Sequence, residues 1–235
     1  MSGYDRIKVY QTQEHPCSYL QHRDSQSVFI DPQITVDRKT FTYLSEMGFR
    51  RSGDFIYRPN CKNCESCIST RIPIQEFKPS RSHRRIIKRN ADLEVRLTEP
   101  ALTNENYQLF SDYIYARHAD GDMFPPSEEM FDSFLVQTRS QTEFLQLYLG
   151  DELIAVSVVD QLDNALSAIY TFFSPNHEKR SLGTYCILQQ LELASARDLD
   201  YLYLGYWVKE CQKMAYKIQF RPIELLINEQ WRSLS

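Results

Sequence analysis

The sequence predicts an α+β fold in which a small Cys-containing N-terminal module, residues 1–92, precedes a more regular domain, residues 93–235. Its 235 residues allow one large domain or two small ones. With 42% hydrophobic and 25% charged residues, it has the usage of an ordinary globular protein. The first ninety residues are rich in Cys, Arg, Ser and Pro and show little periodicity, whereas strand and helix patterns alternate from Leu93 onward.

The N-terminal part contains few predicted elements. Residues 41–48 predict a short helix that ends at Gly48, because glycine favours the conformation that closes a helix. Residues 49–59 predict two short strands around the Ser-Gly-Asp sequence at 52–54, which has the composition of a turn.

The C-terminal part begins with a strand and two helices. Apolar and polar residues alternate over Leu93–Thr98, as in a half-buried strand. Thr103 is expected to cap a helix that runs to about His118. Ser127, which two glutamates follow, is expected to begin a second helix that runs to about residue 138.

Three antiparallel strands come next. Residues 144–149 and 153–160 predict a hairpin around the Gly-Asp pair between them, and residues 165–173 predict a third strand. The remaining elements are a helix, a strand, a short helix and a strand, over residues 181–198, 201–207, 210–216 and 222–227. This order of elements resembles the GNAT-type acetyltransferase fold, so we expect a GNAT-like acyltransferase domain, although likeness of fold says little about activity.

The composition also excludes several classes of protein. No run of 18 or more apolar residues is present, so we expect no membrane span and no membrane partner. The polar N-terminus, residues 1–6, lacks the apolar core of a signal peptide and predicts a cytoplasmic protein. Only 7 glycines are present, which argues against large glycine-rich phosphate loops.

Three of the six cysteines fall within seven residues, as Cys61, Cys64 and Cys67. A spacing of two residues lets neighbouring thiolates face one ion from a tight turn. Cys17 is the candidate fourth ligand. Four thiolates suit a zinc ion or an iron–sulfur cluster, and the spacing does not choose between them. The alternatives are free buried thiols or a redox pair.

One segment carries a strong local charge. The net charge of the chain is −4, yet residues 50–89 hold eleven Lys or Arg and three Asp or Glu, a local charge of +8 that leaves −12 for the rest. Such density is typical of contact with a nucleic-acid backbone, and the alternative is a solvated surface. The candidate contacts are Lys78, Arg81, His83, Arg84, Arg85, Lys88 and Arg89.

Several long motifs resemble one known family. Residues 49–72, 78–85, 170–185 and 203–226 are similar, in the same order, to motifs of the arginyl-tRNA–protein transferases and their bacterial leucyl relatives. The resemblance spans nearly the whole chain. Leu20 stands where the eukaryotic branch has the second Cys of a pair that takes part in an iron–sulfur cluster.

The resemblance implies a reaction and its partners. The family moves an aminoacyl group from a charged tRNA to the N-terminal amine of a protein, which marks that protein for N-degron degradation. The compact chain with three clustered cysteines resembles the bacterial branch. The implied partners are leucyl-tRNA and proteins that begin with Asp or Glu, with no DNA partner.

The implied reaction sets requirements for the acceptor site. The donor ester is already activated and the acceptor amine has a pKa of about 7.7–8.0, so no cofactor and no covalent nucleophile is required. An acidic acceptor side chain requires a cation, ideally an arginine that binds both oxygens. Arg71 is the first candidate because it lies within a resemblance motif. Arg58 and Arg81 are alternatives, with general tRNA or surface contact as the competing interpretation.

The leucyl group requires an apolar pocket. Its candidates lie at a predicted strand end and helix start, with core packing as the alternative, and are Phe172, Phe173, Leu182 and Tyr185. The candidates for a general base are Tyr206 and Lys209, just after a predicted strand, and His177.

Three other functions compete with leucyl transfer. Arginyl-tRNA is the alternative donor, since the residues alone do not separate the two. A CoA-dependent GNAT acetyltransferase is the second alternative, because residues 180–185 partly resemble the pyrophosphate-binding run of that superfamily. The third is a non-enzymatic RNA-binding module stabilised by zinc, which leaves the regular C-terminal half unexplained.

Overall fold

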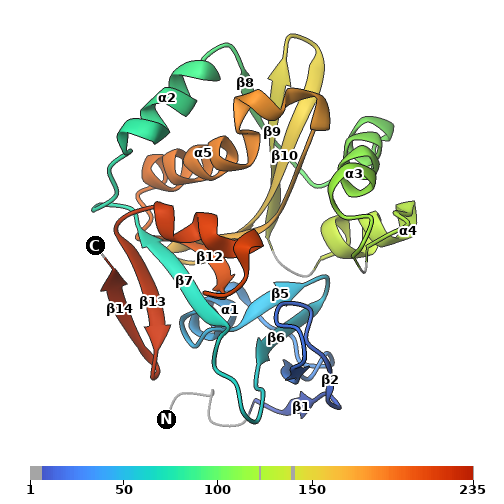
Figure 1. Cartoon of the computed structure of the whole chain (residues 1–235), viewed down its shortest axis with the longest axis vertical. Coiled ribbons are helices and arrows are strands. Elements are labelled where there is room, and N and C mark those ends of the chain that lie inside the picture. The colour runs from blue at the N-terminus through green and yellow to red at the C-terminus, as the bar shows by residue number, and fades with distance from the viewer. Residues whose placement is uncertain (1–6, 122, 139–140, 235) are drawn as a thin grey trace.

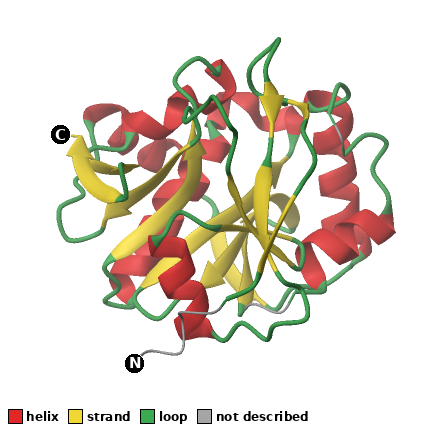
Figure 2. Cartoon of the chain, turned by 90° about the horizontal axis from the view of Figure 1, so that it is seen from below, coloured by secondary structure: helices red, strands yellow, loops and turns green. Residues whose placement is uncertain are grey.

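The fold is a mixed helix-and-sheet structure in which helices cover both faces of a large sheet (Figures 1 and 2). The computed structural model describes residues 7–121, 123–138 and 141–234. Residues 1–6, on which the cytoplasmic prediction rests, lie outside the described residues. Within the described residues, no helix has both the length and the apolar character needed to cross a membrane.

The helical elements are α1 (Arg38–Glu46), α2 (Arg81–Arg89), α3 (Asn104–Arg117), α4 (Glu128–Phe131), the π-helical turn η1 (Asp132–Val136), the 3-10 helices η2 (Pro175–Arg180) and η3 (Gln212–Gln219), and α5 (Leu182–Ala196). The strands are β1 (Val9–Gln11), β2 (His15–Pro16), β3 (Asp24–Ser25), β4 (Ser27–Ile30), β5 (Arg50–Ser52), β6 (Phe55–Pro59), β7 (Ile68–Pro73), β8 (Glu94–Thr98), β9 (Thr142–Leu149), β10 (Glu152–Gln161), β11 (Ala165–Phe173), β12 (Tyr201–Trp207), β13 (Ile223–Ile227) and β14 (Gln230–Leu234).

The large sheet has eight strands in the order β14-β13-β7-β12-β11-β10-β9-β8. Its one parallel pair is β11 with β12, and the other pairs of this sheet are antiparallel. The chain crosses from β11 to β12 through α5, because two parallel strands need a long connection. β7 precedes residue 93 and lies between β12 and β13, so the sheet draws strands from both sides of the predicted division at residue 92.

Helix starts follow the predicted caps. The side chains of Thr103 and Ser127 accept hydrogen bonds from the backbone N–H groups three residues later, which confirms both predictions. Asp37 caps α1 in the same way, so this helix starts earlier than the predicted residue 41. Gly48 follows its end with φ of +85°, a conformation that glycine adopts without strain.

Alternating side chains of the sheet build a core on each face. On β9, Phe144 and Tyr148 pack with α3 and α4, whereas Leu145 and Leu147 pack with α5. α2 packs against α5 on the same face of the sheet (Figure 1). The four-stranded sheet β1-β4-β6-β5 and α1 lie below the large sheet in Figure 1. Phe41 of α1 packs there with Tyr203 of β12.

Several predicted elements differ from the structure. β8 was predicted as half-buried, but all five of its residues are exposed because it is an edge strand. The helix predicted from Ser127 to about residue 138 is shorter in the structure. Only the four residues of α4 are α-helical, and a π-helical turn follows them. The short helix predicted near 210–216 is the 3-10 helix η3. The sequence patterns did not indicate β7, α2 or β14.

Candidate functional site

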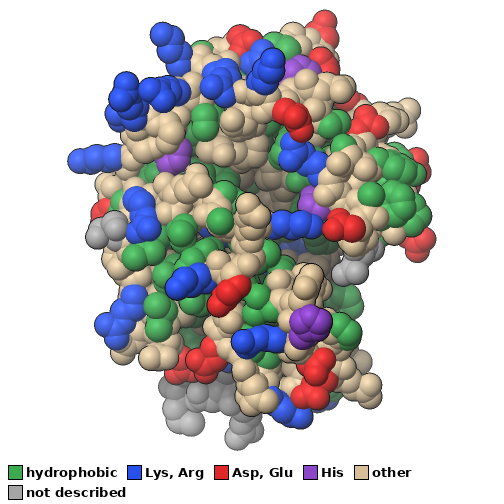
Figure 3. Space-filling view, in the orientation of Figure 1, with side chains coloured by type: hydrophobic (Ala, Val, Ile, Leu, Met, Phe, Trp, Pro, Cys, Tyr) green, Lys and Arg blue, Asp and Glu red, His purple; other side chains and the backbone are tan. Residues whose placement is uncertain are grey.

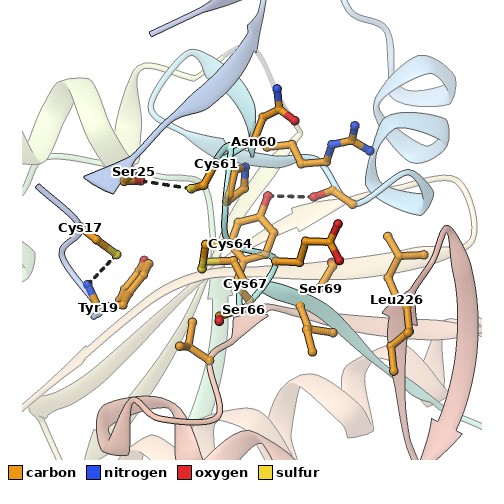
Figure 4. Close-up of a pocket in the computed structure, with 18 of the residues that line it drawn as sticks. Cys17, Tyr19, Ser25, Asn60, Cys61, Cys64, Ser66, Cys67, Ser69 and Leu226 are labelled. Carbon is orange, nitrogen blue, oxygen red and sulfur yellow. Dashed lines mark hydrogen bonds between the residues drawn. The ribbon is translucent and has the colours of Figure 1, made fainter. Parts of the chain in front are cut away.

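The four predicted cysteine ligands line one pocket of about 450 Å³ between the small sheet and the ends of β7, β12 and β13 (Figure 4). Cys17 Sγ accepts hydrogen bonds from the backbone N–H groups of Tyr19 and Leu20, at 3.5 and 3.4 Å. Cys61 Sγ accepts one from the N–H of Gln26 at 3.4 Å. The tertiary structure therefore brings Cys17 to the same cavity as the C-x-x-C-x-x-C run.

The thiols of this pocket differ in acidity. Burial raises the pKa of Cys67 to about 12, and the neighbouring cysteines add to this effect. Hydrogen bonds from Ser66 lower the pKa of Cys64. The four thiols offer the ligand type that zinc and iron–sulfur clusters need. Within residues 7–121, 123–138 and 141–234, however, no three His, Cys, Asp or Glu side chains converge as metal ligands do.

Charged side chains of both signs also line the cysteine pocket. Arg23 and Arg58 supply positive charge, and Asp24, Glu46, Glu65 and Glu229 supply negative charge. Arg58 donates from Nη1 to the carbonyl oxygen of Met47 at 3.0 Å. This mixture of charges suits a zwitterionic ligand better than a simple anion.

Tyr206 forms part of the pocket wall and is buried. Its hydroxyl donates to the carbonyl oxygen of Gly48 at 2.8 Å. Burial raises the pKa of Tyr206 well above its ordinary value, so the phenol stays protonated. Lys209 is exposed just beyond β12, and His177 places Nδ1 3.2 Å from Ser174 Oγ at the end of β11. The three candidates for a general base, Tyr206, Lys209 and His177, therefore do not lie together at one site.

Arg71 lies away from the cysteine pocket, and its predicted role in selecting the acceptor stays a prediction. Its guanidinium lies outside the pocket lining and donates from Nε to Glu224 at 2.6 Å and from Nη1 to Tyr203 at 3.3 Å. The rings of Tyr201 and Trp231 lie 3.6 and 4.2 Å from its central carbon. Burial alone would lower the pKa of Arg71, but these hydrogen bonds raise it. The side chain is fully engaged by β12, β13 and β14.

Residues 81–89 of the basic segment form α2, and Lys and Arg side chains gather at the upper left of the face in Figure 3, where α2 lies. Ser80 caps the helix, because its side chain accepts a hydrogen bond from the backbone N–H of His83. The exposed side chains are Lys78, Arg81, Arg84, Arg85, Lys88 and Arg89. They form one face, the geometry that the prediction of a phosphate contact requires.

His83 is the exception on α2. It is buried, stacks on Phe220 with ring centroids 4.8 Å apart and completes the capping box with Ser80. Burial lowers the pKa of His83, which favours the neutral imidazole. The side chain of His83 thus anchors the helix to the core, away from the exposed cations, and its predicted RNA contact stays a prediction.

The predicted leucyl pocket is mostly core. Phe172 and Leu182 are fully buried within two hydrophobic clusters. Tyr185 is buried with Leu182, and Phe173 packs against Gly183 and Tyr113. None of these residues lines the cysteine pocket. Core packing, the alternative in the sequence analysis, therefore describes Phe172, Leu182 and Tyr185.

Two buried cations that the sequence analysis did not single out, Arg50 and Lys217, lie beside the sheet without a carboxylate partner among the described residues. Arg50 is 5% exposed, and burial lowers its pKa. Lys217 is 7% exposed, and burial with the nearby Arg50 lowers its pKa to about 7. Neither forms an ion pair with a carboxylate, whereas Arg51, adjacent to Arg50, contacts Asp160 through two hydrogen bonds of 2.5 and 2.8 Å. Lys217 follows the apolar residues 214–216 and precedes Ile218, which was a signal in the sequence, whereas Arg50, next to Arg51 and Ser52, gave none.

Comparison with known proteins places this mixed sheet, its basic helix and its pocket in a class of transferases. Two family models match the chain, described as the C terminus and the N terminus of arginine-tRNA-protein transferase, over residues 105–227 and 15–85. The chain belongs to the arginine-tRNA-protein transferase family.

Full-length relatives carry a more specific name. The chain is 50% identical to the aspartate/glutamate leucyltransferase of Pseudomonas fluorescens (strain Pf0-1), covering 98% of each chain. It is also 50% identical to that of Pseudomonas savastanoi pv. phaseolicola, covering 100% of each.

Solved structures offer weaker likenesses. A DUF2156 domain from Agrobacterium fabrum is 12% identical, with a TM-score of 0.45 over 72% of this chain and 52% of that one. L-PGS from Bacillus licheniformis is 11% identical, with a TM-score of 0.47 over 61% of this chain and 47% of that one. This chain thus spans about half the length of each of these solved chains.

Proposed function

We propose that this protein is an aminoacyltransferase that moves leucine from leucyl-tRNA to the α-amine of proteins with N-terminal Asp or Glu, which marks them for N-degron degradation. The observation that carries the proposal is 50% identity, over essentially the full length, to relatives named aspartate/glutamate leucyltransferase. All six cysteines are free thiols, the usual state in a reducing compartment, which supports the cytoplasm as the place of action.

The exposed cations of α2 support a tRNA partner. Arg180 lies beside the end of α2 but is paired with Asp92, to which it donates at 2.9 and 2.8 Å, so it is not counted among them. Such a surface holds an RNA backbone and reads no base identity. We assign residues 93–235 to a GNAT-like aminoacyltransferase domain and residues 1–92 to a Cys-containing module, with β7 completing the sheet of the former.

We assign the cysteine pocket to the N-terminus of the acceptor protein. An acceptor that begins with Asp or Glu presents a carboxylate beside an α-ammonium group, and the pocket lining offers charges of both signs. Arg58 replaces Arg71 as the candidate for the acidic side chain, because Arg58 lines the pocket and Arg71 is already paired. Arg23 is the second cation of the lining.

A transfer assay with varied donors tests the proposal. Purified protein receives leucyl-tRNA and a peptide that begins with Asp, Glu, Asn or Ala. We expect a Leu-peptide from the Asp and Glu peptides only. Transfer from arginyl-tRNA alone, or turnover of acetyl-CoA without transfer from leucyl-tRNA, would overturn the assignment of the donor.

A zinc ion or iron–sulfur cluster at Cys17, Cys61, Cys64 and Cys67 stays a prediction. Transfer from an activated ester needs no cofactor, so such a group would order the pocket rather than take part in chemistry. Metal analysis of protein purified without oxygen tests this prediction, with a Cys64→Ser and Cys67→Ser double variant as the control. About one zinc, or iron with equal sulfide, per chain in the wild type and loss in the variant is the expected result.

A further inference from the structure

An open groove of about 410 Å³ lies between α2 and α5, which pack side by side on one face of the large sheet (Figure 1). Its volume falls within the range of about 300–1,000 Å³ that small-molecule sites occupy. The apolar residues of its lining are Ile74, Phe77, Pro79, Ile87, Leu188 and Leu191. Ile87 is 37% exposed, although five of the nine residues of α2 are Lys or Arg. The groove is therefore an accessible apolar surface beside the basic helix.

Polar side chains of α5 line the same groove. Gln189, Glu192 and Ser195 follow one another at intervals of three residues, a spacing that places side chains on one side of a helix. The Gln189 amide donates from Nε2 to Glu192 Oε2 at 3.5 Å, which is longer than the ~2.9 Å of a strong hydrogen bond. Glu192 is exposed and, among the residues that the structure describes, forms no ion pair with a Lys or Arg. Its carboxylate is therefore available to accept hydrogen bonds from a ligand.

A cation lies on the α2 side of the groove. Arg84 donates from Nη1 to the carbonyl oxygen of Pro79, a residue of the lining, at 2.6 Å. This hydrogen bond holds an exposed guanidinium beside the apolar surface. Arg84, Ile87 and Lys88 are three and four residues apart, so they share one side of α2. The positive charge thus lies next to the groove and not inside it.

These features match the parts of an unpaired nucleotide. An apolar surface accepts the face of a base, and an arginine beside it binds the phosphate. A glutamine amide pairs with the edge of adenine, and a carboxylate accepts from the exocyclic amine of cytosine. Uracil presents a carbonyl oxygen at that position, which the carboxylate of Glu192 would repel. Side chains read RNA bases where these are unpaired, so a base in the groove would come from a single-stranded part of the RNA.

Other occupants use fewer of these groups. An apolar peptide segment or a second copy of the chain would cover the apolar lining but would leave the Glu192 carboxylate without a partner. An anionic lipid would satisfy Arg84, but Glu192 would repel its head group. A base with an exocyclic amine and an adjoining phosphate engages the lining, the carboxylate and the guanidinium together.

We propose that the groove between α2 and α5 binds one unpaired adenine or cytosine of the tRNA, with Gln189 and Glu192 at the edge of the base and Arg84 at its phosphate. This inference rests on the proposed function, because it takes the RNA partner to be tRNA. The exposed cations of α2 hold the backbone without reading sequence, and the groove adds a contact that depends on the base.

A matched pair of glutamine variants tests the groove. Gln189→Ala removes its amide, and the control Gln108→Ala removes an exposed amide on α3 that likewise donates to an acid of its own helix, Asp112. We expect the affinity for uncharged tRNA to fall about tenfold in Gln189→Ala and to stay unchanged in Gln108→Ala. The slope of log affinity against log salt should stay unchanged in both, since neither variant removes a phosphate contact. Wild-type affinity in Gln189→Ala would overturn the proposal.

Ile87→Ala tests the apolar lining. The shorter side chain offers less surface to the face of a base, so we expect tRNA binding to weaken about threefold to tenfold with an unchanged salt slope. Tm should stay close to that of the wild type, because Ile87 is exposed. A loss of affinity that appears only together with a lower Tm would show that Ile87 merely packs α2, and would overturn the proposal.

A titration with free nucleotides tests the choice of base and requires no leucyl transfer. Isotope-labelled wild-type protein receives AMP, CMP, GMP or UMP in turn, and NMR follows the backbone amide signals of residues 87, 189 and 192. We expect AMP and CMP to shift these signals more than GMP or UMP do, and we expect Glu192→Gln to lose the preference over UMP. Equal shifts from all four nucleotides, or shifts confined to other residues, would overturn the proposal.

Light scattering tests the competing occupant, a second copy of the chain. A monomer is the expected result. A dimer that becomes a monomer in Ile87→Asp would assign the groove to the second copy and overturn the proposal. Wild-type protein that shows the expected nucleotide shifts but transfers no leucine would instead overturn the proposed function alone.

Discussion

The protein buries arginines in two kinds of surroundings. Arg51 and Arg71 each meet a carboxylate, of Asp160 and Glu224, and both ion pairs join segments far apart in the sequence. Arg50 meets only a backbone carbonyl and leaves one nitrogen without a partner. A paired buried charge holds strands together, whereas an unpaired one is retained at a cost in stability. The difference separates arginines whose ion pairs stabilise the fold from one whose burial no carboxylate offsets.

The largest expected effect is on the Arg51 pair. Arg51→Met leaves Asp160, which is fully buried, without its guanidinium partner. We expect the free energy of unfolding to fall by about 3–5 kcal/mol, as when one partner of a buried ion pair is removed. Urea denaturation measures this change. The matched variant is Arg50→Met, which strands no carboxylate and should lose far less stability. Equal losses in the two variants would remove the distinction between them.

Arg71→Met tests the second buried arginine that is paired with a carboxylate. It breaks the contacts with Glu224 and Tyr203, so we expect a loss of about 1–3 kcal/mol in the free energy of unfolding. The preference for Asp- over Ala-peptides should stay unchanged per folded molecule. Arg58→Gln, at the pocket, should instead raise KM for Asp-peptides selectively. A selective loss of acidic acceptors in Arg71→Met would restore the original prediction for this residue.

The smallest effect concerns the exposed cations of α2. Unlike Arg51, these side chains are neither buried nor paired with a carboxylate of the described residues. Arg85→Ala should weaken tRNA binding slightly and reduce the slope of log affinity against log salt by about 1. Arg96→Ala, which removes an exposed arginine that contacts Glu94 on β8, is the control and should leave the slope unchanged. Filter binding over a salt series measures both. An unchanged slope in Arg85→Ala would show that α2 is a solvated face.

Local sequence patterns predicted most of the helices and strands but not how deeply each is buried. The caps Thr103 and Ser127 and the hairpin between β9 and β10 depend on neighbouring residues, so they could be read directly. β7 could not, because a strand with partners on both sides is stabilised by residues more than a hundred positions away. For the same reason, a leucyl pocket was predicted at Phe172 and Leu182, where packing from two helices fills the space.

By itself, the sequence determined the family, the order of the main elements, the basic segment and the clustering of three cysteines, since each depends on residue type and short-range spacing. Only the tertiary structure decided which cations are free. It turned His83 inward, paired Arg71 with Glu224, and left Arg50 and Lys217 without carboxylates beside Gly205. Whether a charged side chain is exposed, paired or buried without a partner depends on the desolvation and the contacts that folding imposes. Those contacts come from distant parts of the chain.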